Sequence, residues 1–141
     1  MPALVDTNVL VYLFDPAHPT KQRQALALIR AQSARDELRI PHQALIEFVP
    51  AVTKPRPGAR PLLTDGEART EVESFLATFP ILYPNDAVVR TAIRGAAVYQ
   101  LSWFDAHLWA YAECLGLSQI YSEDFQHGRL YGTVRALNPF R

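Results

Sequence analysis

The sequence has little cysteine, no long apolar run and no excess of charge of either sign. Its single cysteine, Cys114, cannot form a disulfide within the chain, so nothing indicates secretion. The N-terminus lacks a basic segment leading into an apolar stretch, and no apolar run is long enough to span a bilayer. These absences argue against a signal peptide and a membrane segment, and we expect a cytoplasmic protein.

The charges of the chain balance, because fourteen basic and fourteen acidic residues give a formal net charge of zero. Proteins that bind nucleic acids usually carry a positive excess, so such a role here would require a local basic patch or a bound metal ion. Disorder is not expected, because 49% of the residues are hydrophobic and the net charge is low. A chain of 141 residues predicts one folded domain, residues 1–141, whose core needs no disulfides.

Short apolar segments alternate with helical patterns along the chain, without an internal repeat. The expected strands are residues 3–5, 38–40, 81–83 and 119–121, with a fifth at 133–136. The expected helices are residues 8–14, 20–34, 42–53, 64–79, 85–99 and 102–116. This alternation predicts an α/β protein with a largely parallel central sheet of four to five strands flanked by helices.

Several predicted helix ends carry their own signals. Thr64 and Glu67 have the spacing of a capping box, and Thr20 and Asn85 can cap the helices that follow them. Gly116 suits the end of a helix. Residues 54–61 hold three prolines and one glycine, so this segment is the one clear loop.

Two acidic residues follow predicted strands. Asp6 comes directly after residues 3–5, and Asp124 lies three residues beyond 119–121. Parallel sheets bind ligands beyond the carboxyl ends of their strands, so we expect both carboxylates to face one crevice. Taken singly, each aspartate could equally cap the next helix.

Two further acids lie on predicted helices. Glu47 lies in mid-helix among apolar residues. An ionised carboxylate in such a place is energetically costly unless a cation pairs with it or a donor forms a hydrogen bond to it. A salt bridge to a buried arginine is the structural alternative. Asp105 should face the interior edge of its helix, although Ser102, three residues earlier, would also suit a capping box with it.

Together these four acids predict a metal site. Clustered carboxylates cannot all ionise without a counter-charge, and Mg²⁺ or Mn²⁺ prefers oxygen ligands. Such an ion can activate water for attack on a phosphodiester. Zinc is not expected, because the histidines are scattered along the chain at His18, His42, His107 and His127.

Several motifs resemble those of PIN-domain nucleases and occur in the same order. They are Val5–Tyr12, Ile46–Phe48, Trp103–Ala106 and Tyr121–Phe125. The closing Leu137–Phe140 is similar to the end of VapC-type toxins, which are bacterial members of that family. The resemblance covers essentially the whole chain. It implies a three-layer fold with a parallel sheet between helices, and endonucleolytic cleavage of RNA at a Mg²⁺ or Mn²⁺ site.

The resemblance also assigns roles to individual residues. The acidic quartet of the family matches Asp6, Glu47, Asp105 and Asp124. Asn8 and Ser122 match polar residues that hold a carboxylate or a water in place. Whether Glu123 shares the role of Asp124 stays open. VapC-type toxins are typically homodimers that a cognate antitoxin holds inactive, so a dimer and an antitoxin partner are expected on this ground.

An acidic site repels phosphate, so RNA binding requires basic groups nearby. Lys54, Arg56 and Arg60 lie in the proline-rich loop after the helix that carries Glu47, and we expect them to hold the RNA backbone. The alternative for these three is an ordinary solvated loop.

Two other functions are weaker alternatives. A phosphatase of the haloacid-dehalogenase type needs a second acid two residues after the first, and here that position is Asn8. A catalytically inactive domain that binds RNA or protein would not need the four acids.

Overall fold

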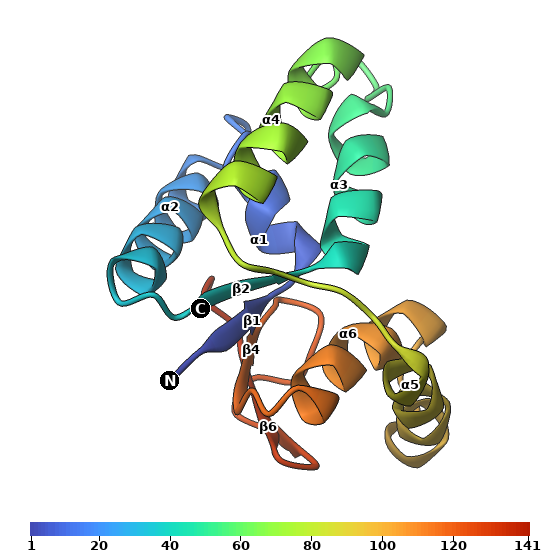
Figure 1. Ribbon diagram of the computed structural model, residues 1–141. Helices are drawn as coiled ribbons and strands as arrows, with labels where there is room; N and C mark the ends of the chain where they lie inside the picture. The colour runs from blue at the N-terminus through green and yellow to red at the C-terminus, as the bar shows by residue number, and fades with distance from the viewer.

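One six-stranded sheet forms the centre of the computed structural model, which describes residues 1–141 (Figure 1). The strands are β1 (Ala3–Val5), β2 (Leu38–Pro41), β3 (Ile81–Leu82), β4 (Gln119–Tyr121), β5 (Leu130–Tyr131) and β6 (Val134–Leu137). Their order in the sheet is β3-β2-β1-β4-β6-β5. All neighbours are parallel except β5 and β6, which are antiparallel.

Six helices connect and cover the strands. They are α1 (Thr7–Tyr12), α2 (Pro19–Ala34), α3 (His42–Thr53), α4 (Asp65–Thr78), α5 (Asp86–Tyr99) and α6 (Trp103–Cys114). Figure 1 shows α1 to α4 on one side of the strands and α5 and α6 on the other. None of these helices combines the length and hydropathy that crossing a membrane requires.

The sheet separates two hydrophobic cores. Leu4 belongs to the core formed with α5, α6, β4 and β6, whereas the next residue, Val5, belongs to the core formed with α1 to α4. Successive strand residues point to opposite faces, so a strand covered on both faces is apolar throughout. The predicted three-layer α/β fold is therefore confirmed.

The sheet has one strand more than the expected four to five. The additional strand β5 has two residues and is joined to β6 by a turn with Gly132 at a φ of +60°. Two residues are too few to show a strand pattern in the sequence. The other strands lie within two residues of the expected limits.

The expected helix ends agree with the structure except at α1 and α2. The first helix covers Thr7–Tyr12, with Asp6 as its cap, where residues 8–14 were expected. Thr64 and Glu67 form both bonds of a capping box, and the Asn85 side chain caps α5. Thr20, in contrast, does not cap α2, which begins one residue earlier at Pro19. Proline suits a first helical position because the N–H that it lacks would have no partner in the helix there.

The pairing of β1 with β4 brings distant segments to one edge of the sheet. Val5 lies opposite Tyr121, and both strands run in the same direction. Asp6 and the segment Ser122–Asp124 therefore leave the sheet side by side, although more than a hundred residues separate them in sequence.

Close packing of α5 on α6 depends on Gly95. A Cβ atom built on Gly95 would lie 2.2 Å from Cζ3 and 2.6 Å from Cε3 of Trp109, whose ring is 5% exposed. The indole is held in this position because its Nε1 donates to the carbonyl of Tyr131 at 2.9 Å. The ring cannot move aside without breaking that bond.

We predict that Gly95→Ala lowers the free energy of unfolding by about 1–3 kcal/mol, because overpacking outweighs the better helix propensity of alanine. Urea denaturation followed by circular dichroism measures the change. The matched control is Gly66→Ala in α4, where an added Cβ would contact nothing within 4 Å. Equal stability changes in the two variants would contradict the packing argument.

Candidate metal centre

Asp6 lies at the carboxyl end of β1 and caps α1, and it is 2% exposed. Its Oδ1 accepts a hydrogen bond from the Thr7 backbone N–H at 2.6 Å. Its Oδ2 accepts from Ser122 Oγ at 2.6 Å and from Asn8 Nδ2 at 3.3 Å. Asp6 therefore does cap the next helix, as the alternative reading of the sequence had it, but the cap uses only one of the two carboxylate oxygens.

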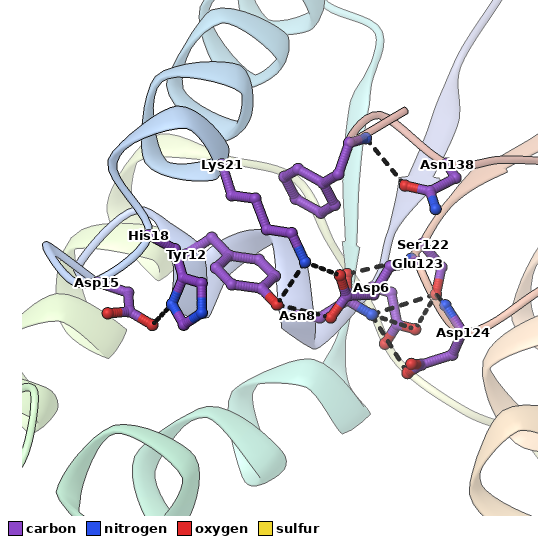
Figure 2. A network of polar contacts seen from close by, with 11 residues as sticks. Asp6, Asn8, Tyr12, Asp15, His18, Lys21, Ser122, Glu123, Asp124 and Asn138 are labelled. Carbon is purple, nitrogen blue, oxygen red and sulfur yellow. Dashed lines mark hydrogen bonds and ion pairs between the residues drawn. The ribbon is translucent and has the colours of Figure 1, made fainter.

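Asn8 and Ser122 tie Asp6 to Asp124, as Figure 2 shows. The Ser122 hydroxyl donates to Asp6 and accepts from the Asp124 backbone N–H at 3.0 Å. The Asn8 amide nitrogen lies 3.2 Å from Asp124 Oδ2 and 3.2 Å from Ser122 Oγ. The two polar residues that the family motif indicated therefore lie directly beside these carboxylates.

Asp105 comes to the same place from the other side of the sheet, in the first turn of α6. Its backbone N–H donates to the Ser102 hydroxyl at 3.1 Å, so Ser102 caps the helix. The Asp105 carboxylate is half-buried, and one of its oxygens lies within 4.8 Å of oxygens of both Asp6 and Asp124. The helix cap and the acidic cluster use different atoms of Asp105 and coexist.

Glu47 lies outside this group of three carboxylates. Its Oε1 accepts from the Thr7 hydroxyl at 2.7 Å and its Oε2 from Gln43 Nε2 at 3.2 Å. No arginine or lysine forms a salt bridge with it. Glu47 is near enough for its negative charge to contribute to the raised pKa of Asp105.

The electrostatics of the cluster call for a cation. Burial raises the pKa of Asp6 to about 7, and the charges of Asp124 and Asp105 add to the effect of burial. Burial, followed by the charge of Asp124, also raises the pKa of Asp105. None of the four acids pairs with a basic side chain. Three uncompensated carboxylates with convergent oxygens fit a hard divalent cation such as Mg²⁺ or Mn²⁺.

Glu123 faces away from this cluster, although it adjoins Asp124 in sequence. Its Oε1 accepts from the Tyr12 hydroxyl at 2.8 Å and its Oε2 from Lys21 Nζ at 3.0 Å. Figure 2 shows Lys21, Tyr12 and Glu123 as a triangle of polar contacts beside Asp6. Glu123 therefore neutralises Lys21 in this structure, and Asp124 alone of the two adjacent acids joins the cluster.

The three basic residues of the proline-rich loop separate into two places. Lys54 and Arg56 line a cavity that also contacts Thr7 and Asn8, next to the acidic cluster. Arg60 lines a different hollow, with Thr64 and Glu67, and its carbonyl accepts two bonds from the Arg56 guanidinium.

Sequence reasoning did not single out Thr7, Tyr12, Lys21 and Gln43, which hold the surrounding carboxylates in place. Gln43 and Glu47 are four residues apart on α3, a spacing that puts both on one helix face and could have been noticed. The contacts of Tyr12 and Lys21 with Glu123 join segments about a hundred residues apart and leave no local signal.

A family profile described as the PIN domain matches residues 3–132. This chain belongs to the PIN domain family. No curated protein sequence matches the chain significantly.

Several solved structures are similar to this chain. FitAB bound to a DNA fragment matches with a TM-score of 0.72 at 15% identity, covering 99% of this chain and 96% of that chain. VapBC-1 from nontypeable Haemophilus influenzae matches with a TM-score of 0.68 at 13% identity, covering 100% of both chains. VapC20 of Mycobacterium tuberculosis, described as a sarcin-ricin loop cleaving toxin, matches with a TM-score of 0.59 at 16% identity, covering 84% and 86%. At these identities the likeness concerns the fold.

The raised pKa of Asp6 makes the stability of the metal-free PIN domain depend on pH. The folded-state pKa of about 7 exceeds the ordinary 3.8, so Asp6 destabilises the fold progressively as the pH rises between these values. Asparagine cannot ionise. We therefore predict that Asp6→Asn gains in melting temperature relative to the unmodified protein as the pH rises from about 4 to about 8.

Thermal melts of both proteins in a metal chelator measure this difference, and comparing the two cancels the titration of all other groups. Excess Mn²⁺ should stabilise the unmodified protein more than Asp6→Asn, because the cation replaces the missing counter-charge. If the difference in melting temperature does not vary with pH, the pKa of Asp6 is not raised in the folded protein.

Proposed function

We propose that the protein is an endoribonuclease that hydrolyses RNA phosphodiester bonds with Mg²⁺ or Mn²⁺, and that it is the cytoplasmic toxin of a toxin–antitoxin pair. The observation that carries the proposal is the convergence of Asp6, Asp105 and Asp124, without any basic partner, at the carboxyl edge of a PIN-domain sheet. Parallel sheets bind their ligands at this edge.

The three carboxylates would hold the cation, and neighbouring polar groups hold two of them, Asp6 and Asp124, in place. Such an ion supplies Lewis acidity, which lowers the pKa of water and stabilises negative charge on the phosphate. Ser122 and Asn8 orient Asp6 and Asp124 through donated hydrogen bonds, so little reorganisation is needed.

We assign Glu47, at the edge of this centre, the role of general base: it would accept a proton from the attacking water. Thr7 and Gln43 each donate a bond to its carboxylate, which fixes its position near Asp105. A general base must be held within reach of the water it activates, and these two bonds provide that constraint.

RNA would approach from the side of Lys54 and Arg56. Both line the cavity next to Asn8, and neither forms an ion pair with a carboxylate. Their charges offset the repulsion between the acidic cluster and phosphate. Arg60 would contribute by holding Arg56, whose guanidinium donates to the Arg60 carbonyl, while the Arg60 side chain lines a separate hollow.

Two partners are part of the proposal. The similar solved structures include toxin–antitoxin complexes bound to DNA, which supports a cognate antitoxin for this chain. A homodimer is supported by an exposed apolar patch formed by Ile46, Trp103 and Phe104, which are 60%, 52% and 64% exposed. These three side chains line one shallow hollow beside Glu47, and patches of this kind commonly mark interfaces.

We predict that the purified protein cleaves RNA in Mg²⁺ or Mn²⁺ and loses this activity in a metal chelator. Asp6→Asn, Asp105→Asn and Asp124→Asn should each lower the cleavage rate by a factor of about 100 or more, because each removes a ligand to the cation. Gel analysis of a labelled single-stranded RNA measures the rate.

The control for these variants is Asp86→Asn, which changes an exposed aspartate of α5 that forms only a surface ion pair with Arg90. It should cleave at the unmodified rate. Metal-independent cleavage, or full activity in all three site variants, would rule out the proposed centre. RNA binding without cleavage would favour the inactive binding module.

We predict that Phe104→Glu converts a dimer into a monomer in solution, because it places a charge in the centre of the apolar patch. Light scattering after size-exclusion chromatography measures the mass. Val98→Glu is the control, since Val98 is 70% exposed on α5 outside this patch. A monomeric unmodified protein would argue against the dimer.

A further inference from the structure

A cavity of about 440 Å³ lies directly beside the acidic centre, between α1, α3 and the proline-rich loop. Its size falls within the range of sites that hold small ligands. Its lining includes Val11, Ala51 and Leu62 as apolar residues and His18, Lys54 and Arg56 as polar ones. Thr7 and Asn8 line this cavity and also contact the acids of the centre. Thr7 donates a hydrogen bond to Glu47, and Asn8 donates to Asp6 and Asp124.

The charges of this cavity favour an anionic ligand. Its two acids are already engaged, Glu123 by Lys21 and Tyr12, and Asp15 by His18 and the Ala17 backbone N–H. Lys54 forms no hydrogen bond or ion pair, and the Arg56 guanidinium bonds only the Arg60 carbonyl. The positive charges are thus the ones left without a partner.

His18 presents a fixed hydrogen-bonding edge. Its Nδ1 lies 2.9 Å from Asp15 Oδ2, and Asp15 is 8% exposed. A carboxylate only accepts, so Nδ1 carries a proton and Nε2 remains for a ligand. The Tyr12 ring meets the His18 ring edge to face at 5.7 Å, and the Tyr12 hydroxyl is held by Glu123 and Lys21. Figure 2 shows this row of side chains leading to Asp6 and Asn8.

We propose that this cavity holds one unpaired nucleoside of the RNA, adjacent to the phosphodiester at the acidic centre. The base lies against Val11, Ala51 and Leu62, His18 Nε2 hydrogen-bonds its edge, and Lys54 and Arg56 bind its phosphate. Unpaired bases of RNA are recognised by hydrogen bonds to their edges, and bases taken out of the stack are held between aromatic or apolar side chains. The inference rests on the proposed function, since it identifies what the proposed nuclease recognises next to its cut.

The first test uses nucleoside 5′-monophosphates and does not depend on cleavage. Each of the four common ones is titrated into the metal-free full-length protein, and binding is followed by amide NMR shifts. At least one should bind saturably, with shifts concentrated at Val11, Ala51 and Lys54. Ala51→Phe fills the cavity and should weaken this binding by about tenfold or more. Ala97→Phe, a change of equal size at an exposed position of α5, should bind as the unmodified protein does.

The second test pairs the protein variant with a change in the RNA. The substrate is a short RNA with a single cut, made intact or with an abasic residue on either side of the cut. Ala51→Phe and His18→Ala should lower kcat/KM on the intact RNA by roughly 10- to 100-fold, the value of one lost base contact. On the RNA whose abasic residue replaces the nucleoside bound in the cavity, both variants should leave kcat/KM unchanged, because the base that they would contact is already missing.

The outcomes separate the two proposals. If no RNA is cleaved but monophosphates bind and Ala51→Phe weakens them, the nuclease proposal fails and the cavity stands as a nucleotide site. If RNA is cleaved while no monophosphate binds and both variants act alike on intact and abasic RNA, the cavity proposal is overturned. Unchanged cleavage in Ala51→Phe, with loss of binding to a protein partner, would overturn it in favour of a protein-binding cavity. Thermal melts of each variant show that it is folded.

Discussion

Repulsion among three carboxylates is the interaction around which the rest of this site is arranged. Asp6 is almost fully buried and lies within a few ångströms of Asp105 and Asp124, yet no basic side chain neutralises them. The pKa of Asp6 is raised to about 7, chiefly by burial, and the charges of Asp124 and Asp105 add to this rise. The fold tolerates this arrangement because Ser122, Asn8 and the Thr7 backbone N–H all donate to Asp6, so the packed sheet holds the charges in place.

The basic groups near the site are arranged in a complementary way. Lys21 pairs with Glu123 and Tyr12 and forms no ion pair with Asp6, Asp105 or Asp124. Lys54 and Arg56 line the cavity next to Asn8 and have no carboxylate partner. Under the proposed function, the unpaired carboxylates would bind the cation and the unpaired basic groups would bind phosphate. Such a separation of charges would allow a chain with a net charge of zero to bind RNA.

The fold was predictable to the extent that it depends on local patterns. Segments 3–5 and 119–121 are short and apolar because both of their faces are covered, and capping residues such as Asn85 and Thr64 act within one turn of a helix. β5 was missed because two residues carry no period, and the beginning of α2 was misplaced because Pro19, rather than a capping side chain, starts it. The first error arises where a local pattern is too short, whereas the second passed over a local signal, the preference of proline for a first helical position.

By itself the sequence determined the α/β class, the two aspartates at strand ends and the motif order that indicated all four acids. Only the tertiary structure decided which acids converge. Asp105 lies with Asp6 and Asp124. Glu47 instead accepts hydrogen bonds from Thr7 and Gln43, and Glu123 pairs with Lys21. The physical reason is that the distance between carboxylate oxygens depends on strand register and helix packing. These are set by contacts between residues far apart in the chain, which leave no mark on any single segment.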